Sequence, residues 1–294
     1  MKLKNGKINL YRNHRKNFIK YKHATYKLAR AENKNNGSNS FIFLLKDPNK
    51  ELPDSIIKFC RYYEGEKDNK RLERFKREIA ALKKAKKNNS KNIIRYCWDY
   101  NCEIDGKKFV YYVMEKAESN LRDYLLDNPL DNQEKLKLSR DILNGLNELH
   151  KIGIYHRDIK PENILFTNDG FKIADLGLLS YRDDDFDGIN EKIGPFGWIS
   201  PEVMSKSLTQ NKDTEFEFDC KIDDKSDVFQ LGKLFWYIFQ GNIPIGQIQQ
   251  DDFKPQIEEI FDLIKRMIQY AKDRRPKMEN VLLEFRKLEK QYAI

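Results

Sequence analysis

The stretch IYHRDIKPENILF, residues 154–166, packs charged side chains between two apolar ends. A helix is disfavoured there, because Pro161 has no backbone N–H and restricts the residue before it. An ordinary surface loop would not need apolar residues at both ends. The pattern therefore predicts a loop that is anchored from below and holds polar groups at fixed positions, as functional loops on rigid scaffolds do.

The composition favours one large domain or two lobes around an ordinary core. The chain has 294 residues, of which 39% are hydrophobic and 34% are charged, and its formal net charge is +9. That is enough apolar sequence for a sizeable core. Neither a zinc-finger spacing nor an RNA-binding run occurs, and a basic balance alone is weak evidence, so we expect no DNA or RNA partner.

The four cysteines fit no zinc-ligand spacing, and we see no signal peptide. Free thiols are typical of a reducing compartment, so we expect a cytoplasmic protein. The longest apolar window, VFQLGKLFWYIF (228–239), contains a lysine and is too short to span a bilayer. It predicts a buried helix, and we expect no transmembrane segment.

Hydrophobic periodicity divides the chain into a strand-rich first part and a helical second part. Short strand-like runs flank residues 68–87, where apolar residues recur at helical spacing. The turn EIDG (103–106) predicts a hairpin. From residue 119 onward the patterns are mainly helical, and the helix predicted at 131–153 ends at Gly153.

We therefore predict a basic N-terminal extension at 1–25, a small β-rich lobe with one main helix at 26–116, and a larger, mainly helical lobe at 117–294. The extension is either a docking arm for an anionic surface or, as charge runs usually are, a solvated or lightly packed segment. A cleft between two lobes is a common place for a ligand.

The opening stretch belongs to an ordered set of motifs. HRDIKPEN (156–163) is followed by DLG (175–177) and SPE (200–202). This set closely resembles the H-R-D-x-K-x-x-N, D-F-G and A-P-E motifs of the eukaryotic-like (Hanks-type) protein kinases. The resemblance covers roughly residues 26–290 and implies an α+β, bilobal protein kinase fold with a small β-rich N-lobe and a larger, mainly helical C-lobe.

The residue types in this stretch fit phosphoryl transfer, which needs metal ligands, a cation near the phosphates and a carboxylate near the attacking hydroxyl. Asp158 can accept the proton of that hydroxyl, and Lys160 can offset developing negative charge. Asn163 and Asp175 offer the hard oxygen ligands that Mg²⁺ prefers. The resemblance implies ATP with Mg²⁺, or Mn²⁺, as cofactors, and Lys160 favours the serine/threonine class over the tyrosine class.

The resemblance also implies a nucleotide site. Lys58 is expected to reach the α- and β-phosphates, with Glu78 rather than Glu73 as its helix partner, because Glu78 lies four residues before Leu82. The other positions expected near the adenine ring or the phosphates are Gly37, Leu44, Ile56, Met114, Glu115, Ala117 and Leu165.

Other matched positions are expected to support the site. His156 should pack beneath the loop, and Asp227 should clamp the backbone of the loop. Glu202 and Arg275 should form a buried ion pair. Arg157 should face the activation segment (residues 175–202).

The activation segment contains no threonine, and its hydroxyl groups belong to Ser180, Tyr181 and Ser200. One of its aspartates is predicted to pair with Arg157 and partly replace a phosphate, although an exposed acidic loop is at least as plausible. The four aspartates concerned are Asp183, Asp184, Asp185 and Asp187.

Several departures from the family pattern keep alternatives open. The glycine-rich loop retains Gly37, but Asn39 and Ile42 stand where the other glycines are expected, which predicts weaker phosphate cover. Leu176 replaces the phenylalanine of D-F-G. Pro195 stands where serine/threonine kinases usually have threonine.

The sequence thus predicts a protein serine/threonine kinase that transfers the ATP γ-phosphate to a protein hydroxyl, with autophosphorylation among its reactions. The first alternative is a pseudokinase or nucleotide-binding scaffold, because the glycine-rich loop is degraded. The second is a small-molecule kinase, although such enzymes generally lack Lys160 in this arrangement and the segment that ends in SPE.

Overall fold

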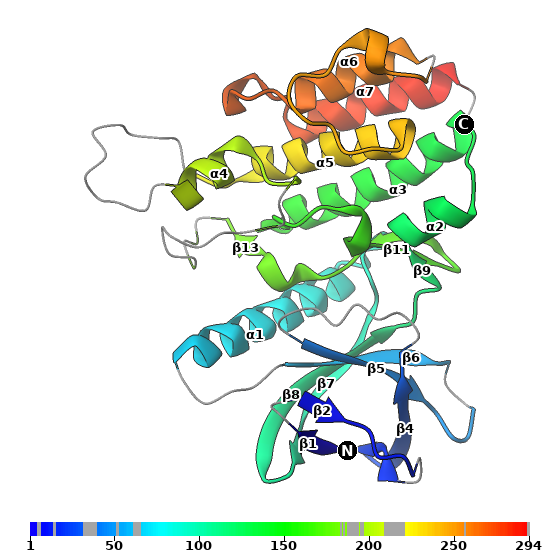
Figure 1. The fold of residues 1–294 in the computed structure, drawn as a ribbon, viewed down its shortest axis with the longest axis vertical. Coiled ribbons are helices and arrows are strands. Elements are labelled where there is room, and N and C mark those ends of the chain that lie inside the picture. Colours follow the sequence, from blue (N-terminus) through cyan, green and yellow to red (C-terminus); the bar gives the residue numbers. More distant parts are fainter. Residues whose placement is uncertain are drawn as a thin grey trace. The chain divides into compact units, whose positions relative to one another are not determined.

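The computed structural model describes the chain as two compact units. The strand-rich unit comprises Met1–Asn88 and Ile94–Ala117, and the helical unit comprises Asn89–Ile93 and Glu118–Ile294 (Figure 1). The residues outside the description are 5–6, 14–15, 32–39, 51–52, 61–65, 183, 185, 187–193, 195–196, 209–220, 256 and 293–294, together with the side chains of 66–68 and 207–208.

The strand-rich unit is built on a six-stranded antiparallel sheet with the order β3-β4-β5-β6-β8-β7. Its strands are β3 (Phe18–Tyr21), β4 (Ala24–Arg30), β5 (Ser40–Lys46), β6 (Ser55–Cys60), β7 (Tyr96–Ile104) and β8 (Lys107–Glu115). The helix α1 (Glu66–Lys87) contacts β6 and β7. The predicted hairpin joins β7 to β8, and Asp105 and Gly106 take the left-handed conformation that its tight turn requires.

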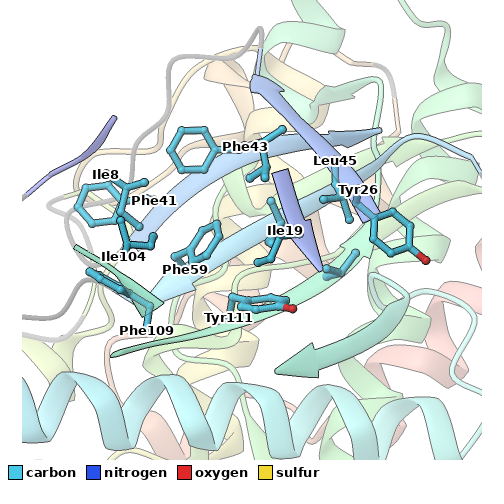
Figure 2. Close-up of a cluster of buried hydrophobic side chains, with 13 residues drawn as sticks. Ile8, Ile19, Tyr26, Phe41, Phe43, Leu45, Phe59, Ile104, Phe109 and Tyr111 are labelled. Atoms are coloured by element: carbon cyan, nitrogen blue, oxygen red, sulfur yellow. The ribbon is translucent and has the colours of Figure 1, made fainter. Parts of the chain in front are cut away.

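One face of this sheet carries the hydrophobic core of the unit (Figure 2). Ile57 and Phe59 of β6 and Tyr111 of β8 are fully buried in it. Successive side chains of a strand point to opposite faces, so Lys58 and Tyr112 project from the other face. The sheet therefore separates a structural face from a face with polar groups.

The N-terminal segment packs into this unit and is not a solvated extension. The strands β1 (Lys2–Lys4) and β2 (Lys7–Asn9) pair antiparallel, and β3 pairs with β4 at the edge of the sheet. Ile8 and Ile19 are buried in the core with exposed fractions of 5% and 6%. Most of the described apolar residues of the segment thus pack, with the exposed Phe18 as an exception, while its described basic side chains stay exposed.

The helical unit contains six α-helices among its described residues. They are α2 (Leu121–Asp127), α3 (Asn132–Lys151), α4 (Pro201–Leu208), α5 (Asp224–Gln240), α6 (Glu258–Met267) and α7 (Met278–Gln291). The helices α3, α5, α6 and α7 pack together (Figure 1). Asp131 and Asp223 cap α3 and α5 with capping boxes, and the left-handed Gly241 ends α5.

Short strands and 3₁₀ turns hold the loops of the helical unit. The strands are β9 (Ser119–Asn120), β10 (Ile154–Tyr155), β11 (Ile164–Thr167), β12 (Gly170–Ile173) and β13 (Ser180–Tyr181), and the 3₁₀ turns are η2 (Pro161–Asn163), η3 (Leu176–Leu178), η4 (Gln250–Asp252) and η5 (Lys272–Arg274). The strand β11 lies between β9 and β12, and β10 pairs with β13. The HRD loop (residues 156–163) thus runs from β10 to β11 with both ends paired.

The segment Asn89–Ile93 belongs to the helical unit although it lies between two elements of the other unit. The Asn92 carbonyl oxygen accepts a hydrogen bond from the Ile173 N–H over 2.8 Å. Gly145 of α3 lies against the same carbonyl group.

Across the described ranges, none of the helices combines the length and apolar content needed to cross a membrane.

Candidate active site

Three polar side chains of the HRD loop converge in the helical unit. Lys160 Nζ lies 2.9 Å from Asp158 Oδ1 and 2.7 Å from Asp158 Oδ2. The Asn163 amide Nδ2 donates to Asp158 Oδ2 and to the Asp158 carbonyl oxygen, each over 2.8 Å. The Asp158 carboxylate is therefore held in a fixed orientation by a cation and an amide.

The surroundings of Asp158 suit a proton acceptor. Burial raises the pKa of its carboxyl group above the usual range, while the Lys160 ammonium opposes that rise. A carboxylate with a raised pKa accepts a proton more readily than one in water does. Asp158 can thus take a proton from a hydroxyl group within hydrogen-bonding reach.

Asp175 reaches the same region from the start of the activation segment. The Ala174 N–H donates to the Asn163 carbonyl oxygen over 2.8 Å, and the Asp175 charge adds to the rise in the pKa of Asp158. Asp175 is left-handed, with φ of 58°, as is Arg157, with φ of 67°. Such backbone costs about 1–3 kcal/mol per residue and is concentrated at functional sites.

The oxygens of Asn163 and Asp175 fit a magnesium site with few protein ligands. Both N–H groups of the Asn163 amide point to Asp158, so its Oδ1 is directed the other way. Mg²⁺ is commonly held by one or two protein ligands together with substrate phosphates. Within the residues that the structure describes, no group of three or more His, Cys, Asp or Glu side chains could hold a metal by itself.

The buried Asp227 of α5 anchors the start of the HRD loop. Its Oδ2 accepts from the His156 N–H and its Oδ1 from the Arg157 N–H, over 2.8 and 2.7 Å. The sequence predicts this clamp. The His150 Nε2 also lies 2.8 Å from Asp227 Oδ2, a contact that the sequence did not indicate. Burial alone would raise the pKa of Asp227, but these hydrogen bonds hold it below the usual range.

His156 is fully buried and joins two segments of the site. Its Nδ1 accepts from the Asp158 N–H over 3.2 Å, so its Nε2 carries the proton and donates to the Ala174 carbonyl oxygen over 3.0 Å. Both ring nitrogens are occupied by backbone groups. His156 thus lies beneath the loop and is not placed to act as a base.

Arg157 contacts the activation segment through backbone groups. Its Nε donates to the Leu178 carbonyl oxygen over 2.6 Å. Of the four aspartates predicted as partners, Asp184 lies within the described residues. The pairing stays a prediction, because the other three, Asp183, Asp185 and Asp187, lie outside them.

The three hydroxyl groups of the activation segment differ in accessibility. Ser180 is 4% exposed and lies in β13, which pairs with β10. Ser200 is fully buried, and Tyr181 is half-buried. Phosphorylation of either serine would therefore require the segment to open. Pro195, which replaces the expected threonine, lies outside the described residues.

In the strand-rich unit, Lys58 and Glu78 form a buried ion pair. Lys58 Nζ lies 2.8 Å from Glu78 Oε1, and both side chains are almost completely buried. Glu73, the competing acid of α1, pairs instead with Lys76 at the surface. The Tyr112 hydroxyl group donates to the same Glu78 oxygen over 2.8 Å. No sequence motif pointed to Tyr112, although Tyr112 lies two residues before Met114 and on the same face of the sheet.

An apolar row lies beside Lys58 on the same face of the sheet. Leu44 of β5 is opposite Ile56 of β6, and Ile56 is opposite Met114 of β8. Lys58 follows Ile56 by two residues and therefore shares this face. These three side chains form an apolar row on this face of the sheet.

The remaining positions expected near the nucleotide belong to different parts of the chain. The Glu115 N–H donates to the Arg95 carbonyl oxygen over 3.0 Å, so a contact of Glu115 with adenine would use its own carbonyl group. Ala117 is the last residue of the strand-rich unit. Leu165 is half-buried in β11 of the helical unit. Gly37 lies outside the described residues.

A second buried ion pair lies at the other end of the activation segment. The Arg275 guanidinium donates to both Glu202 carboxylate oxygens, over 2.8 and 2.9 Å. Burial opposes ionisation of Glu202, but the hydrogen bonds and charge of Arg275 hold its pKa below the usual range. The same guanidinium also donates to the carbonyl oxygens of Lys225, Gln269 and Tyr270. The pair therefore ties α4 to the start of α5 and to η5.

Comparison with known protein families shows to which family this chain belongs. Residues 37–291 match the model of the protein kinase domain, which is most of the chain. The chain belongs to the protein kinase family. This membership confirms the resemblance drawn from the motifs, and the strand-rich and helical units agree with the predicted α+β kinase fold.

The kinase domain is similar to several characterised kinases. The serine/threonine-protein kinase cds1 of Schizosaccharomyces pombe is 30% identical over 285 residues, which cover 90% of this chain and 58% of cds1. The dual specificity protein kinase TTK of Mus musculus is 26% identical over 72% of this chain and 24% of TTK. The sensor for unfolded proteins in the ER ire1 of Schizosaccharomyces pombe is 29% identical over 70% of this chain and 22% of ire1. The chain thus spans less than two thirds of each of these relatives.

The kinase motifs identified the charged residues of the site but missed neutral hydrogen-bonding partners. Gln230 of α5, which belongs to none of the matched motif positions, hydrogen-bonds to the backbone of the HRD loop. One signal was available, because Gln230 follows Asp227 by three residues and lies on the same face of α5. A buried glutamine in an apolar helix needs partners.

Proposed function

We propose that this kinase domain is an ATP- and Mg²⁺-dependent protein serine/threonine kinase that transfers the γ-phosphate to a protein hydroxyl. The observation that supports this most directly is the contact of Asp158 with both Lys160 and Asn163. A carboxylate with a raised pKa, a cation beside it and an oriented amide form the set that phosphoryl transfer uses.

In this proposal each residue has a separate task. Asp158 orients the substrate hydroxyl and accepts its proton as the oxygen attacks the γ-phosphorus, while the bond from that phosphorus to the β-phosphate oxygen breaks and ADP leaves. Lys160 offsets negative charge on the transferred group, which is the main way a protein accelerates this reaction. Asn163 and Asp175 would hold Mg²⁺, which neutralises phosphate charge when bound.

The strand-rich unit would bind the rest of the nucleotide. Lys58, held in place by Glu78, contacts the α- and β-phosphates. The row of Leu44, Ile56 and Met114 contacts the adenine ring. A lysine that is buried and paired is oriented before ATP arrives, which reduces the entropy lost on binding.

Two alternatives remain for the experiment to distinguish. A pseudokinase would bind nucleotide without transfer, and its case rests on the departures at Asn39, Ile42 and Pro195. A small-molecule kinase would modify metabolites. The paired Lys58 and the Asp158 group support a working protein kinase, because a scaffold has no chemical need for either.

Autophosphorylation and transfer to a generic protein substrate test the function directly. Wild-type protein with ATP and Mg²⁺ should incorporate phosphate at serine or threonine, mapped by mass spectrometry. Asp158→Asn should reduce the rate by about 10²–10⁴-fold, because it removes the proton acceptor. Asp251→Asn, an identical change at an exposed residue of η4, is the matched control and should keep the wild-type rate.

The outcomes separate the alternatives. A wild-type rate equal to that of Asp158→Asn would reject the kinase and favour the pseudokinase. Phosphate found only on added metabolites would favour the small-molecule kinase. The location in a reducing cytoplasm, which the cysteine pattern of the sequence predicts, stays a prediction.

A further inference from the structure

Gln230 hydrogen-bonds to the backbone on both sides of Asp158. Its Oε1 accepts from the Ile159 N–H over 3.0 Å, and its Nε2 donates to the Arg157 carbonyl oxygen over 3.1 Å. The side chain is 1% exposed, and Ile159 and Arg157 are also buried. No motif of the sequence includes Gln230.

A primary amide is well suited to this position. The two peptide groups that flank Asp158 present the Arg157 carbonyl oxygen on one side and the Ile159 N–H on the other. A glutamine side chain carries one acceptor and one donor at its end, so it can satisfy both. Serine, alanine or methionine at the same site could not hold both groups. Water has little access to replace the amide, because the surroundings are buried.

The two hydrogen bonds act on a strained segment of backbone. Arg157 is left-handed, with φ of 67°, and such conformations persist when neighbouring groups hold them in place. Asp227, one turn earlier in α5, binds the N–H groups of His156 and Arg157. Gln230 continues this series to the Arg157 carbonyl group and the Ile159 N–H. The helix thus fixes the backbone on both sides of the catalytic aspartate.

The activation segment packs against this arrangement. A Cβ atom added to Gly194 would lie 3.5 Å from the Arg157 carbonyl oxygen and 3.8 Å from Gln230 Nε2. Gly194 is itself left-handed, with φ of 97°. The amide therefore lies between the HRD loop and a part of the segment that precedes SPE.

We propose that Gln230 is a positioning residue for phosphoryl transfer, which sets the orientation of the Asp158 carboxylate by fixing the peptide groups on either side of it. This inference rests on the proposed kinase function. A displacement of about 1 Å at a reacting group can lower a rate by about 10²-fold. Loss of the amide should therefore act on kcat and should leave ATP binding by Lys58 unaffected.

The test compares kcat and the KM for ATP in Gln230→Met, which keeps the length of the side chain and removes both hydrogen bonds. We expect kcat to fall at least tenfold, with the KM for ATP within twofold of wild type. Leu234→Ala, one turn further along α5 and fully buried, is the control for lost stability. It should lower the melting temperature and keep kcat when both variants are assayed well below their melting temperatures.

A second variant gives a readout that a merely structural residue would not produce. In Gln230→Glu the new carboxyl group can donate to the Arg157 carbonyl oxygen only when it is protonated. The charged or titratable groups nearest to it are Asp227 on the same helix, His156, Arg157 and Asp158 of the loop, and His150 of α3, which contacts Asp227. The buried negative charge of Asp227 disfavours ionisation of the new group. The activity of this variant relative to wild type should therefore rise as the pH falls from 8.5 to 6.

The results distinguish this inference from the proposed function. A wild-type kcat in Gln230→Met, or equal losses in Gln230→Met and Leu234→Ala, would overturn the positioning role while the kinase reaction stands. A pH-independent activity ratio for Gln230→Glu would also overturn it. If wild type itself shows no transfer that depends on Asp158, the proposed function falls, and the positioning role falls with it.

Discussion

Replacing Arg275 by alanine should destabilise the helical unit strongly. Arg275 is 2% exposed, and its guanidinium donates to both Glu202 carboxylate oxygens. Its other donors bind backbone carbonyl groups of α5 and of the segment before η5. Alanine removes all of these donors and leaves the Glu202 carboxylate buried with the Ser226 hydroxyl group as a remaining donor, over 2.6 Å.

The size of the effect follows from the burial. Removing one partner of a buried ion pair costs about 3–5 kcal/mol, because the other charge stays uncompensated. In a unit of this size, a loss of 1 kcal/mol lowers the melting temperature by about 2–4 °C. We therefore expect the melting temperature of Arg275→Ala to lie about 6–20 °C below that of wild type. The loss of about 3–5 kcal/mol is a large share of the 5–15 kcal/mol that is typical of the free energy of unfolding of a domain.

Thermal unfolding followed by circular dichroism measures this effect. Arg274→Ala, the same change at the exposed neighbouring arginine, is the matched control and should stay within about 0.5 kcal/mol of wild type. Arg275→Lys should give an intermediate loss, since one ammonium cannot reproduce the bidentate contact. A melting temperature of Arg275→Ala within 2 °C of the Arg274→Ala value would refute the reasoning.

The pH dependence of this loss has a definite sign. Arg275 lowers the pKa of Glu202 in the folded state, so its contribution is present above the unfolded pKa, about 4.3 for glutamate. The contribution disappears as the pH falls through the folded pKa and the carboxylate is protonated. The difference in melting temperature between wild type and Arg275→Ala should therefore narrow below about pH 4.5. A difference that stays constant to pH 3 would contradict this account.

Three further predictions concern single contacts. Gly145→Ala should lower the free energy of unfolding by about 1–3 kcal/mol, because the new Cβ would lie 2.5 Å from the Asn92 carbonyl oxygen. At a helix position without that contact, the same change would raise the free energy of unfolding by about 1 kcal/mol. A urea titration measures the sign of the change, and a gain in stability would contradict the prediction. Lys160→Met should move the acidic limb of the pH profile of kcat/KM to higher pH, because the Lys160 ammonium lowers the pKa of Asp158. An acidic limb at the wild-type pH would show that Asp158 is not the group that titrates there. Tyr112→Phe should reduce stability by about 1.5–3 kcal/mol in thermal unfolding through loss of its hydrogen bond to Glu78, and an unchanged melting temperature would count against that bond.

The sequence predicted the HRD loop well because its contacts are local. Asp158, Lys160 and Asn163 lie within six positions, and Pro161 restricts the backbone between them. A short segment with few conformations brings such side chains together without help from distant residues. The helix stop at Gly153 and the EIDG turn were equally accessible, since they depend on adjacent residues.

The N-terminal segment shows where charge patterns mislead. Its many basic residues indicated a docking arm or a solvated or lightly packed extension, but Ile8 and Ile19 are buried on the sheet. Burial of a few apolar side chains decides the position of a strand, while its lysines can remain in water. A short strand offers too few alternating positions for its buried face to be recognised from the sequence alone.

The sequence by itself determined the chemistry of this protein: which acids, amides and cations occur, and which of them share one loop. Only the tertiary structure decided which neutral groups hold that chemistry in place. Tyr112 meets Glu78 across 34 positions, and Gln230 meets Ile159 across 71. Such contacts depend on strand register and on the rotation of a buried helix, and these are set by the packing of the whole unit rather than by any neighbouring residue.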